Sequence, residues 1–174
     1  MAVKLGADGE QIGAVYALMG IASLFMPGII GIIADRWVNA ERLLGILHLI
    51  AGGILIAVAN TTDYGSFYAL MLFLCMCYMP TLALTYTIAY SALNKARLDI
   101  VKTFPPIRVW GTVGFILAMW IVDLSGSGRS EMQFYISAGF AILLGIYSFT
   151  LPACPPNRDA GAEKKSLLST LGLL

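Results

Sequence analysis

Residues 103–124 of the chain read TFPPIRVWGTVGFILAMWIVDL. From Ile107 to Leu124 almost every residue is apolar or small, and the run is long enough for a membrane-spanning helix, which needs about 17–25 such residues. Arg108 lies inside this run, close to one end. An arginine costs about 2.5–3.5 kcal/mol at the centre of a span and less near its end, where the side chain can reach the headgroups. Arg108 therefore either reaches the headgroups or faces a water-filled cavity.

The composition indicates the class of protein. Of the 174 residues, 59% are hydrophobic and 12% are charged, whereas a soluble domain has about 45–50% apolar and 25% charged residues. The apolar residues occur in long blocks, which predicts an all-α membrane protein in a lipid bilayer. A net charge of +1, without a basic patch or a Gly-rich phosphate loop, gives no reason to expect a nucleic-acid partner. Cys75, Cys77 and Cys154 form no metal pattern, and we expect no cofactor, metal site or catalytic residue.

Five apolar blocks are long enough to cross a membrane. We expect a polar outer segment over residues 1–11 and a transmembrane bundle over residues 12–151. A cytoplasmic linker would follow over residues 152–174. The five transmembrane helices are predicted at about residues 12–34, 43–59, 67–91, 107–124 and 134–151.

The distribution of basic residues predicts the orientation, because cytoplasmic loops carry an excess of Lys and Arg. Of the 11 Lys and Arg, we set Arg108 aside as intramembrane. Two others, Lys4 and Arg129, lie on one side of the predicted membrane, and the remaining eight lie on the other. The N-terminus is then outside and the C-terminus is cytoplasmic. Residues 1–11 contain no signal-peptide core, so we expect that a preceding helix is missing. The eight basic residues on the predicted cytoplasmic side are Arg36, Arg42, Lys95, Arg97, Lys102, Arg158, Lys164 and Lys165.

Arg108, Thr112 and Phe115 are spaced i, i+4 and i+7, so they share one face of a helix. Gly111 lies beside them and leaves room for a ligand to approach the backbone. An arginine fork, a hydroxyl and an aromatic ring can donate, accept and stack, which suits a small polar ring compound such as a nucleobase or nucleoside. In the alternative reading, Arg108 caps its helix near the headgroups and Thr112 bonds its own backbone.

The third predicted span contains Pro80 near its middle, and a proline there frees a carbonyl and kinks a helix. Tyr78, Thr81 and Thr85 flank it at spacings that share a face, so they are candidate cavity-lining residues. The lone histidine, His48, lies in an apolar stretch and is interpreted as a packed, hydrogen-bonded side chain.

Glycines in the predicted spans are expected to let neighbouring helices pack closely. The positions concerned are Gly45, Gly52, Gly53 and Gly114.

Carboxylates are scarce in the predicted spans, although proton coupling requires a titratable group along the transport pathway. Asp123, the carboxylate nearest to an apolar block, lies at the outer end of its span. We therefore expect no proton-coupling residue in this chain.

Several segments resemble a known family of carriers. Gly31, Asp35 and Arg36 form a G-x-x-x-D-R pattern, which resembles the signature of the major facilitator superfamily. Its downstream basic part departs from that signature, with Arg42 the only candidate. Further segments resemble, in order, the nucleoside:proton symporter family within that superfamily. They are IGAVY at 12–16, FMP at 25–27, YMPTL at 78–82 and FPPIRVWGT at 104–112.

The resemblance implies a partial major-facilitator-type N-terminal bundle, whose five spans are the second to sixth of twelve. It implies that Arg108, Thr112 and Phe115 contact the nucleoside and that Gly31, Asp35 and Arg36 form a cytoplasmic gate. The complete carrier would import nucleosides with protons across a bacterial inner membrane by alternating access. The coupling carboxylates and the other half of the site would lie in a C-terminal bundle. A carrier for another small polar solute, a non-transporting membrane subunit and a gene remnant remain alternatives, whereas an enzyme is not expected.

Overall fold

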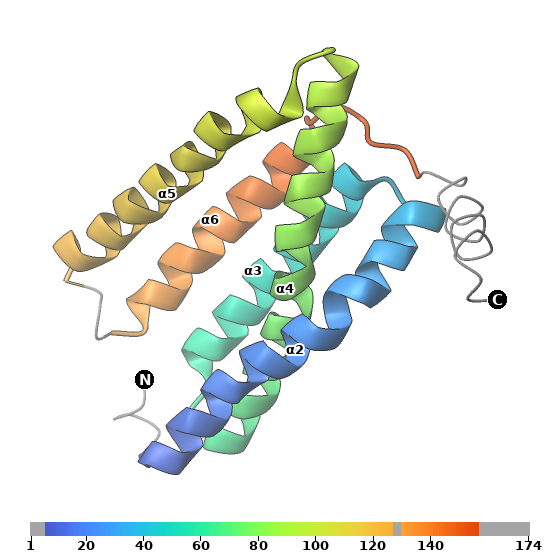
Figure 1. Ribbon diagram of the computed structural model, residues 1–174. Helices are drawn as coiled ribbons and strands as arrows, with labels where there is room; N and C mark the ends of the chain where they lie inside the picture. Colours follow the sequence, from blue (N-terminus) through green and yellow to red (C-terminus); the bar gives the residue numbers. More distant parts are fainter. Residues whose placement is uncertain (1–5, 127–129, 157–174) are drawn as a thin grey trace.

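The chain is all-helical in the part that its computed structural model describes, residues 6–126 and 130–156. The expected all-α fold is thereby confirmed for these residues. Residues 1–5 of the predicted outer segment and residues 157–174 of the predicted linker lie outside the described residues. Figure 1 shows the five described helices, which are α2 (Gly9–Arg36), α3 (Ala40–Asn60), α4 (Tyr64–Lys95), α5 (Ile100–Leu124) and α6 (Met132–Ser148).

Acidic residues cap three of the helices, because a side-chain oxygen can accept from the free N–H groups of a first turn. Asp8 and Gln11 form a reciprocal capping box at the start of α2. Asp63 accepts from the backbone N–H of Ser66 at the start of α4, and this hydrogen bond lowers the pKa of the Asp63 carboxyl. Asp99 accepts from the N–H of Val101 at the start of α5. The caps therefore explain where α2, α4 and α5 begin.

Helix α5 begins at Ile100, well before the span predicted from Ile107. Its two prolines, Pro105 and Pro106, lie inside the helix and not in the connection before it. A proline removes one intrahelical hydrogen bond. These two stand in the second turn, beyond the free N–H groups of the first turn, and membrane helices tolerate such a loss. The continuous helical path from Ile100 places Phe104 and Arg108 one turn apart on the same helix.

Four helices, α2 to α5, are long and apolar enough to cross a membrane. Helix α6 is also apolar and has 17 residues, at the short end of the range for a span. Many large apolar side chains on all five helices are exposed, as expected where lipid replaces water around the protein. The chain is therefore an integral membrane protein.

The helices pack mainly in three pairs, which are α3 with α6, α2 with α4 and α3 with α4. Helix α5 lies at one edge of the bundle and packs chiefly on α4 (Figure 1). No residue of α5 is buried. One long face of α5 is thus open in the described part of the chain.

Small residues bring α3 and α6 together. A side chain on Gly45 would lie 3.0 Å from the carbonyl oxygen of Gly145, and one on Gly52 would lie 2.7 Å from Cγ1 of Ile142. The prediction that Gly45 and Gly52 permit close packing is therefore confirmed. For Gly53 and Gly114 it stays a prediction, because nothing in the described structure lies within 4 Å of an added Cβ.

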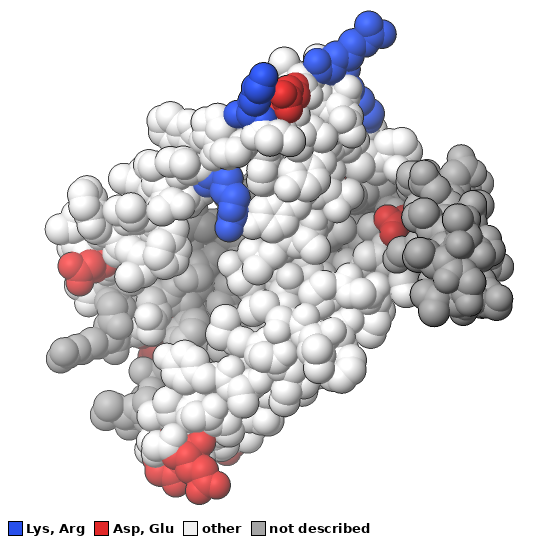
Figure 2. Space-filling model, in the orientation of Figure 1, with Lys and Arg blue, Asp and Glu red and all other residues white. Residues whose placement is uncertain are grey.

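Charged side chains gather at the ends of the bundle. Figure 2 shows basic side chains toward the end where α4 passes to α5, with acidic atoms among them, and a further group of acidic side chains at the opposite end. Of the ten basic residues used to predict the orientation, Lys4, Arg129, Arg158, Lys164 and Lys165 lie outside the described residues.

Candidate functional site

Arg108 is exposed on α5, and its guanidinium lies against an aromatic ring of α4. The guanidinium carbon is 5.0 Å from the ring centroid of Tyr86. This distance is within the range of a cation–π interaction. No ion pair of Arg108 is found in residues 6–126 and 130–156. The ring of Tyr86 therefore lies beside the guanidinium, and no ion pair uses the N–H donors of Arg108 within these described residues.

Thr112 and Phe115 are also exposed, on the same continuous helix as Arg108. Phe115 is 66% exposed. Within the described chain the Thr112 hydroxyl makes no hydrogen bond, unlike the hydroxyls of Thr81 and Thr85, which donate to carbonyls of α4. The alternative in which Thr112 bonds its own backbone is therefore not found. The three predicted contact residues form an open polar and aromatic stripe along α5.

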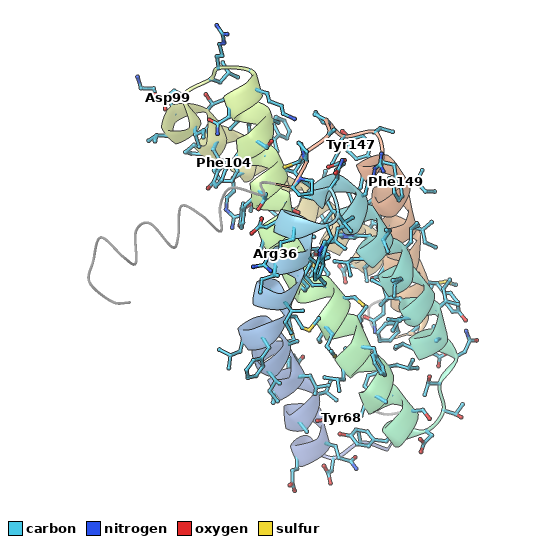
Figure 3. All side chains as sticks on the ribbon, turned by 90° about the vertical axis from the view of Figure 1, so that its right-hand side faces the viewer. Arg36, Tyr68, Asp99, Phe104, Tyr147 and Phe149 are labelled. Carbon is cyan, nitrogen blue, oxygen red and sulfur yellow. The ribbon has the colours of Figure 1, made fainter. Side chains whose placement is uncertain are left out.

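Three aromatic rings join α4 to α5 near Arg108. Phe104 packs edge-on against Tyr86, with ring centroids 5.7 Å apart, and against Tyr90, at 4.7 Å. Figure 3 shows Phe104 near Asp99, at the end of the bundle where α4 is joined to α5. We call Tyr86, Tyr90, Phe104 and Arg108 the α4–α5 ladder. The span predicted from the sequence begins at Ile107 and leaves Phe104 outside it, so these contacts were not predicted.

A cavity of about 640 Å³ lies among the helices, and each of α2 to α6 contributes to its wall. We call it the bundle cavity. Figure 2 shows the visible face hollowed between α5 and α4. Its wall is mostly apolar, and its polar members include Gln11, His48, Tyr64, Tyr78 and Ser137. Arg108, Thr112 and Phe115 do not line it; of α5, only Ala118 does.

The structure separates the three candidate cavity-lining residues of α4. Tyr78 is 45% exposed and lines the bundle cavity. Thr81 is buried, and its hydroxyl donates to the carbonyl of Tyr78 at 2.6 Å. Thr85 is exposed, and its hydroxyl donates to the carbonyl of Thr81 at 2.7 Å. Only Tyr78 of the three thus lies at this cavity.

His48 is buried and its Nδ1 lies 3.0 Å from the carbonyl oxygen of Leu44, so the expected packed and hydrogen-bonded histidine is confirmed. It also lies on the wall of the bundle cavity, which sequence reasoning did not anticipate.

The predicted gate residues lie at the end of α2. Asp35 and Arg36 are exposed there and Gly31 lies one turn earlier. Asp35 borders a second hollow of about 340 Å³, whose wall also includes Lys95 and Cys154. No ion pair of Asp35 occurs in the part of the chain that the structure describes. The hollow therefore brings an acidic and a basic side chain of two helices to one end of the bundle.

Glu41 is a buried carboxylate that lies between the spans predicted at 12–34 and 43–59. It is 3% exposed in the first turn of α3. Its carboxylate accepts from the backbone N–H of Cys154 at 2.8 Å and from the Asn39 side chain at 2.9 Å. The N–H of Ala40 donates to the carbonyl of Cys154 at 3.2 Å. The side-chain nitrogen of Lys95 donates to the carbonyl of Ala153. The backbone after α6 is thus fixed to the ends of α3 and α4.

No group of three His, Cys, Asp or Glu side chains in the described ranges could hold a metal ion.

Comparison with known proteins places the chain in a family. The family model described as "Nucleoside H+ symporter" matches residues 1–174. The chain belongs to this family. The resemblance seen in the sequence is therefore confirmed, and the helical bundle is that of a major-facilitator-type transporter.

Among the similar proteins is the xanthosine permease of Escherichia coli, 48% identical over 168 residues, which are 95% of this chain and 39% of the permease. Another is the nucleoside permease NupG of Escherichia coli, 46% identical over 173 residues, which are 99% of this chain and 41% of NupG. A solved structure of a mutant of the nucleoside transporter NupG matches with a TM-score of 0.87 at 46% identity, covering 91% of this chain and 39% of that one. The chain thus spans about two fifths of the length of the relatives it matches.

Proposed function

We propose that this chain is part of a secondary transporter that imports nucleosides with protons across a bacterial inner membrane by alternating access. The observation that carries the proposal is the open stripe of Arg108, Thr112 and Phe115 on α5, in a family of nucleoside symporters. Related proteins bear the names xanthosine permease and nucleoside permease. The proposed role is transport and not enzymatic catalysis.

The stripe supplies the interactions that a nucleoside requires. A nucleoside has a planar base with hydrogen-bonding edges and a ribose with hydroxyl groups. In our proposal Arg108 donates its in-plane N–H groups to acceptor atoms of the nucleoside. Phe115 stacks on the base, and the Thr112 hydroxyl donates to or accepts from it.

The proposed carrier needs additional segments. The bundle cavity is walled mostly by apolar side chains of five helices, and of α5 it includes Ala118 but not the stripe of Arg108, Thr112 and Phe115. A further apolar helix would pack there without covering the stripe. We propose that the first helix of the complete carrier packs in the bundle cavity. A C-terminal bundle would supply the second half of the nucleoside site and the carboxylates for proton coupling. The isolated chain would accordingly not transport.

We also propose an orientation and a gate. The end that carries Arg36, Arg42 and Lys95 would face the cytoplasm, together with the C-terminal side of the chain. Gly31, Asp35 and Arg36 would then form part of a cytoplasmic gate that closes in one state of the transport cycle and opens in the other.

A chimera tests this function. The 174-residue chain replaces the matched 173-residue stretch of Escherichia coli NupG, and uptake of labelled uridine is measured in cells without other nucleoside carriers. We expect saturable uptake by this NupG chimera, and competition by other nucleosides but not by sugars. If only sugars competed with uridine uptake, the chain would belong to a carrier for another polar solute. If a correctly inserted chimera showed no uridine uptake, the proposal would be contradicted.

The Arg108→Ala variant of the NupG chimera is expected to abolish uptake or reduce it at least about tenfold, because a charged hydrogen bond to the substrate contributes about 1.5–3 kcal/mol. Lys102→Ala is the matched control, since Lys102 is a basic residue on the same helix, 85% exposed and paired only at the surface with Asp99. Both variants are quantified in the membrane by immunoblotting. Equal uptake by Arg108→Ala and the parent would remove Arg108 from the site.

A further inference from the structure

Tyr86 is the aromatic residue that contacts the guanidinium of Arg108. The two side chains come from different helices, since Tyr86 lies on α4 and Arg108 on α5, and α5 packs chiefly on α4. The arginine side chain is long, and holding it in one rotamer costs up to about 2 kcal/mol in conformational entropy. A ring that binds the guanidinium offsets part of that cost before any ligand arrives.

Phe104 fixes the position of the Tyr86 ring along the contact between α4 and α5, relative to Arg108. It lies one turn before Arg108 on α5 and packs edge-on against both Tyr86 and Tyr90, which are themselves one turn apart on α4. The α4–α5 ladder therefore consists of two residues from each helix, in register. Because Phe104 packs against the ring of Tyr86, this ring is held in place and can restrict where the guanidinium of Arg108 lies.

We propose that Tyr86 is a positioning residue that orients Arg108 for the nucleoside. The proposal rests on the function proposed above, in which Arg108 contacts the substrate. Tyr86 itself acts through its ring and not through its hydroxyl, since the contact of Tyr86 with Arg108 is made over the ring face. The substrate thereby meets a guanidinium whose direction is already set.

Variants at two tyrosines of the ladder separate orientation from helix packing. Tyr86→Phe keeps the ring, whereas Tyr86→Leu removes it. Tyr90→Leu is the matched control, because Tyr90 also lies on α4 and packs on Phe104 but makes no cation–π contact with Arg108 in the described structure. We expect Tyr86→Leu to weaken the equilibrium binding of uridine to the purified NupG chimera about 3- to 10-fold. Tyr86→Phe and Tyr90→Leu should bind uridine within about twofold of the parent.

A double-mutant cycle provides the decisive readout. If Tyr86 acts through Arg108, Tyr86→Leu has no further effect on uridine binding in a chimera that already carries Arg108→Ala. Equal losses from Tyr86→Leu with and without the Arg108→Ala substitution would overturn the proposal, as would equal losses from Tyr86→Leu and Tyr90→Leu. Melting temperatures of all variants are recorded, so that a loss of folding is recognised.

Two outcomes distinguish this inference from the proposed function. If Arg108→Ala weakens uridine binding but Tyr86→Leu does not, the positioning role of Tyr86 is wrong and the nucleoside site stands. If Arg108→Ala leaves uridine binding unchanged, the role of Arg108 in the proposed function is wrong, and the inference about Tyr86 fails with it.

Discussion

At the scale of single residues, the partners of a side chain decide its role. Glu41 has a carboxylate in the first turn of α3, an ordinary position for an acidic residue because free N–H groups favour negative charge there. Its burial, however, comes from the segment after α6, whose Cys154 N–H donates to it. That partner lies 113 residues away along the chain, so the sequence around Glu41 could not indicate it.

Replacing Glu41 by alanine leaves the N–H of Cys154 without its acceptor in a buried place. Hydrogen bonds to charged groups contribute about 1.5–3 kcal/mol, so we expect Glu41→Ala to lower the free energy of unfolding by about 2 kcal/mol. The measurement is reversible unfolding in mixed detergent micelles. Glu10→Ala is the control, because Glu10 is an exposed acidic residue in the first turn of α2, and it should change stability little. Equal effects of the two variants would contradict the role given to Glu41.

The stripe of Arg108, Thr112 and Phe115 on α5 illustrates what residue spacing can and cannot predict. Arg108, Thr112 and Phe115 share a face by helical periodicity alone, and that part of the prediction needed no structure. The ring of Tyr86 against Arg108 required the relative placement of α4 and α5. No local pattern encodes this placement, because it depends on contacts between segments that are distant in sequence.

At the scale of helices, the apolar blocks of the sequence predicted which segments are helical. They predicted less well the residues at which the helices begin. Hydropathy locates the membrane-embedded part of a helix, whereas α5 extends beyond it to Ile100 under the cap of Asp99. The sequence likewise showed which residues of α3 are small. It did not show which side of α3 packs against α6. Gly45 and Gly52 face α6, and Gly53 points into open space.

The contact between α3 and α6 gives a prediction at the same scale. Gly45→Ala places a methyl group 2.9 Å from the ring of Phe149 and 3.0 Å from a backbone oxygen, so one helix must shift. We expect a loss of about 1–3 kcal/mol in the free energy of unfolding, the usual cost of overpacking. Gly53→Ala, with nothing within 4 Å, should leave stability unchanged or raise it slightly, since alanine favours helix more than glycine.

The measurement is thermal or detergent-induced unfolding of both purified variants beside the parent. A loss for Gly53→Ala as large as that for Gly45→Ala would show that the close approach of α3 and α6 does not limit stability.

At the scale of the whole molecule, the proposed orientation predicts which connections are accessible from outside the cell. We replace Cys75, Cys77 and Cys154 and introduce one new cysteine at a time into the NupG chimera. Thr62→Cys, in the exposed connection between α3 and α4, should react with a membrane-impermeant thiol reagent in intact cells. Arg97→Cys, in the exposed connection between α4 and α5, should react only after the cells are opened. The reverse pattern would contradict the orientation.

The bundle cavity also belongs to this scale. Five helices from across the chain form its wall, so its existence depends on their packing together and no single segment predicts it. Its mostly apolar wall, which includes Ala118 of α5 but not the stripe of Arg108, Thr112 and Phe115, supports the proposal that a further helix packs there.

The central claim is that Arg108 contacts a nucleoside, and a structure of the NupG chimera with bound uridine tests it most directly. We expect uridine acceptor atoms about 2.7–3.2 Å from the guanidinium nitrogens of Arg108, with the base against the ring of Phe115 and the guanidinium still in contact with the ring of Tyr86. Uridine bound elsewhere in the carrier, with Arg108 out of hydrogen-bonding distance, would contradict the account.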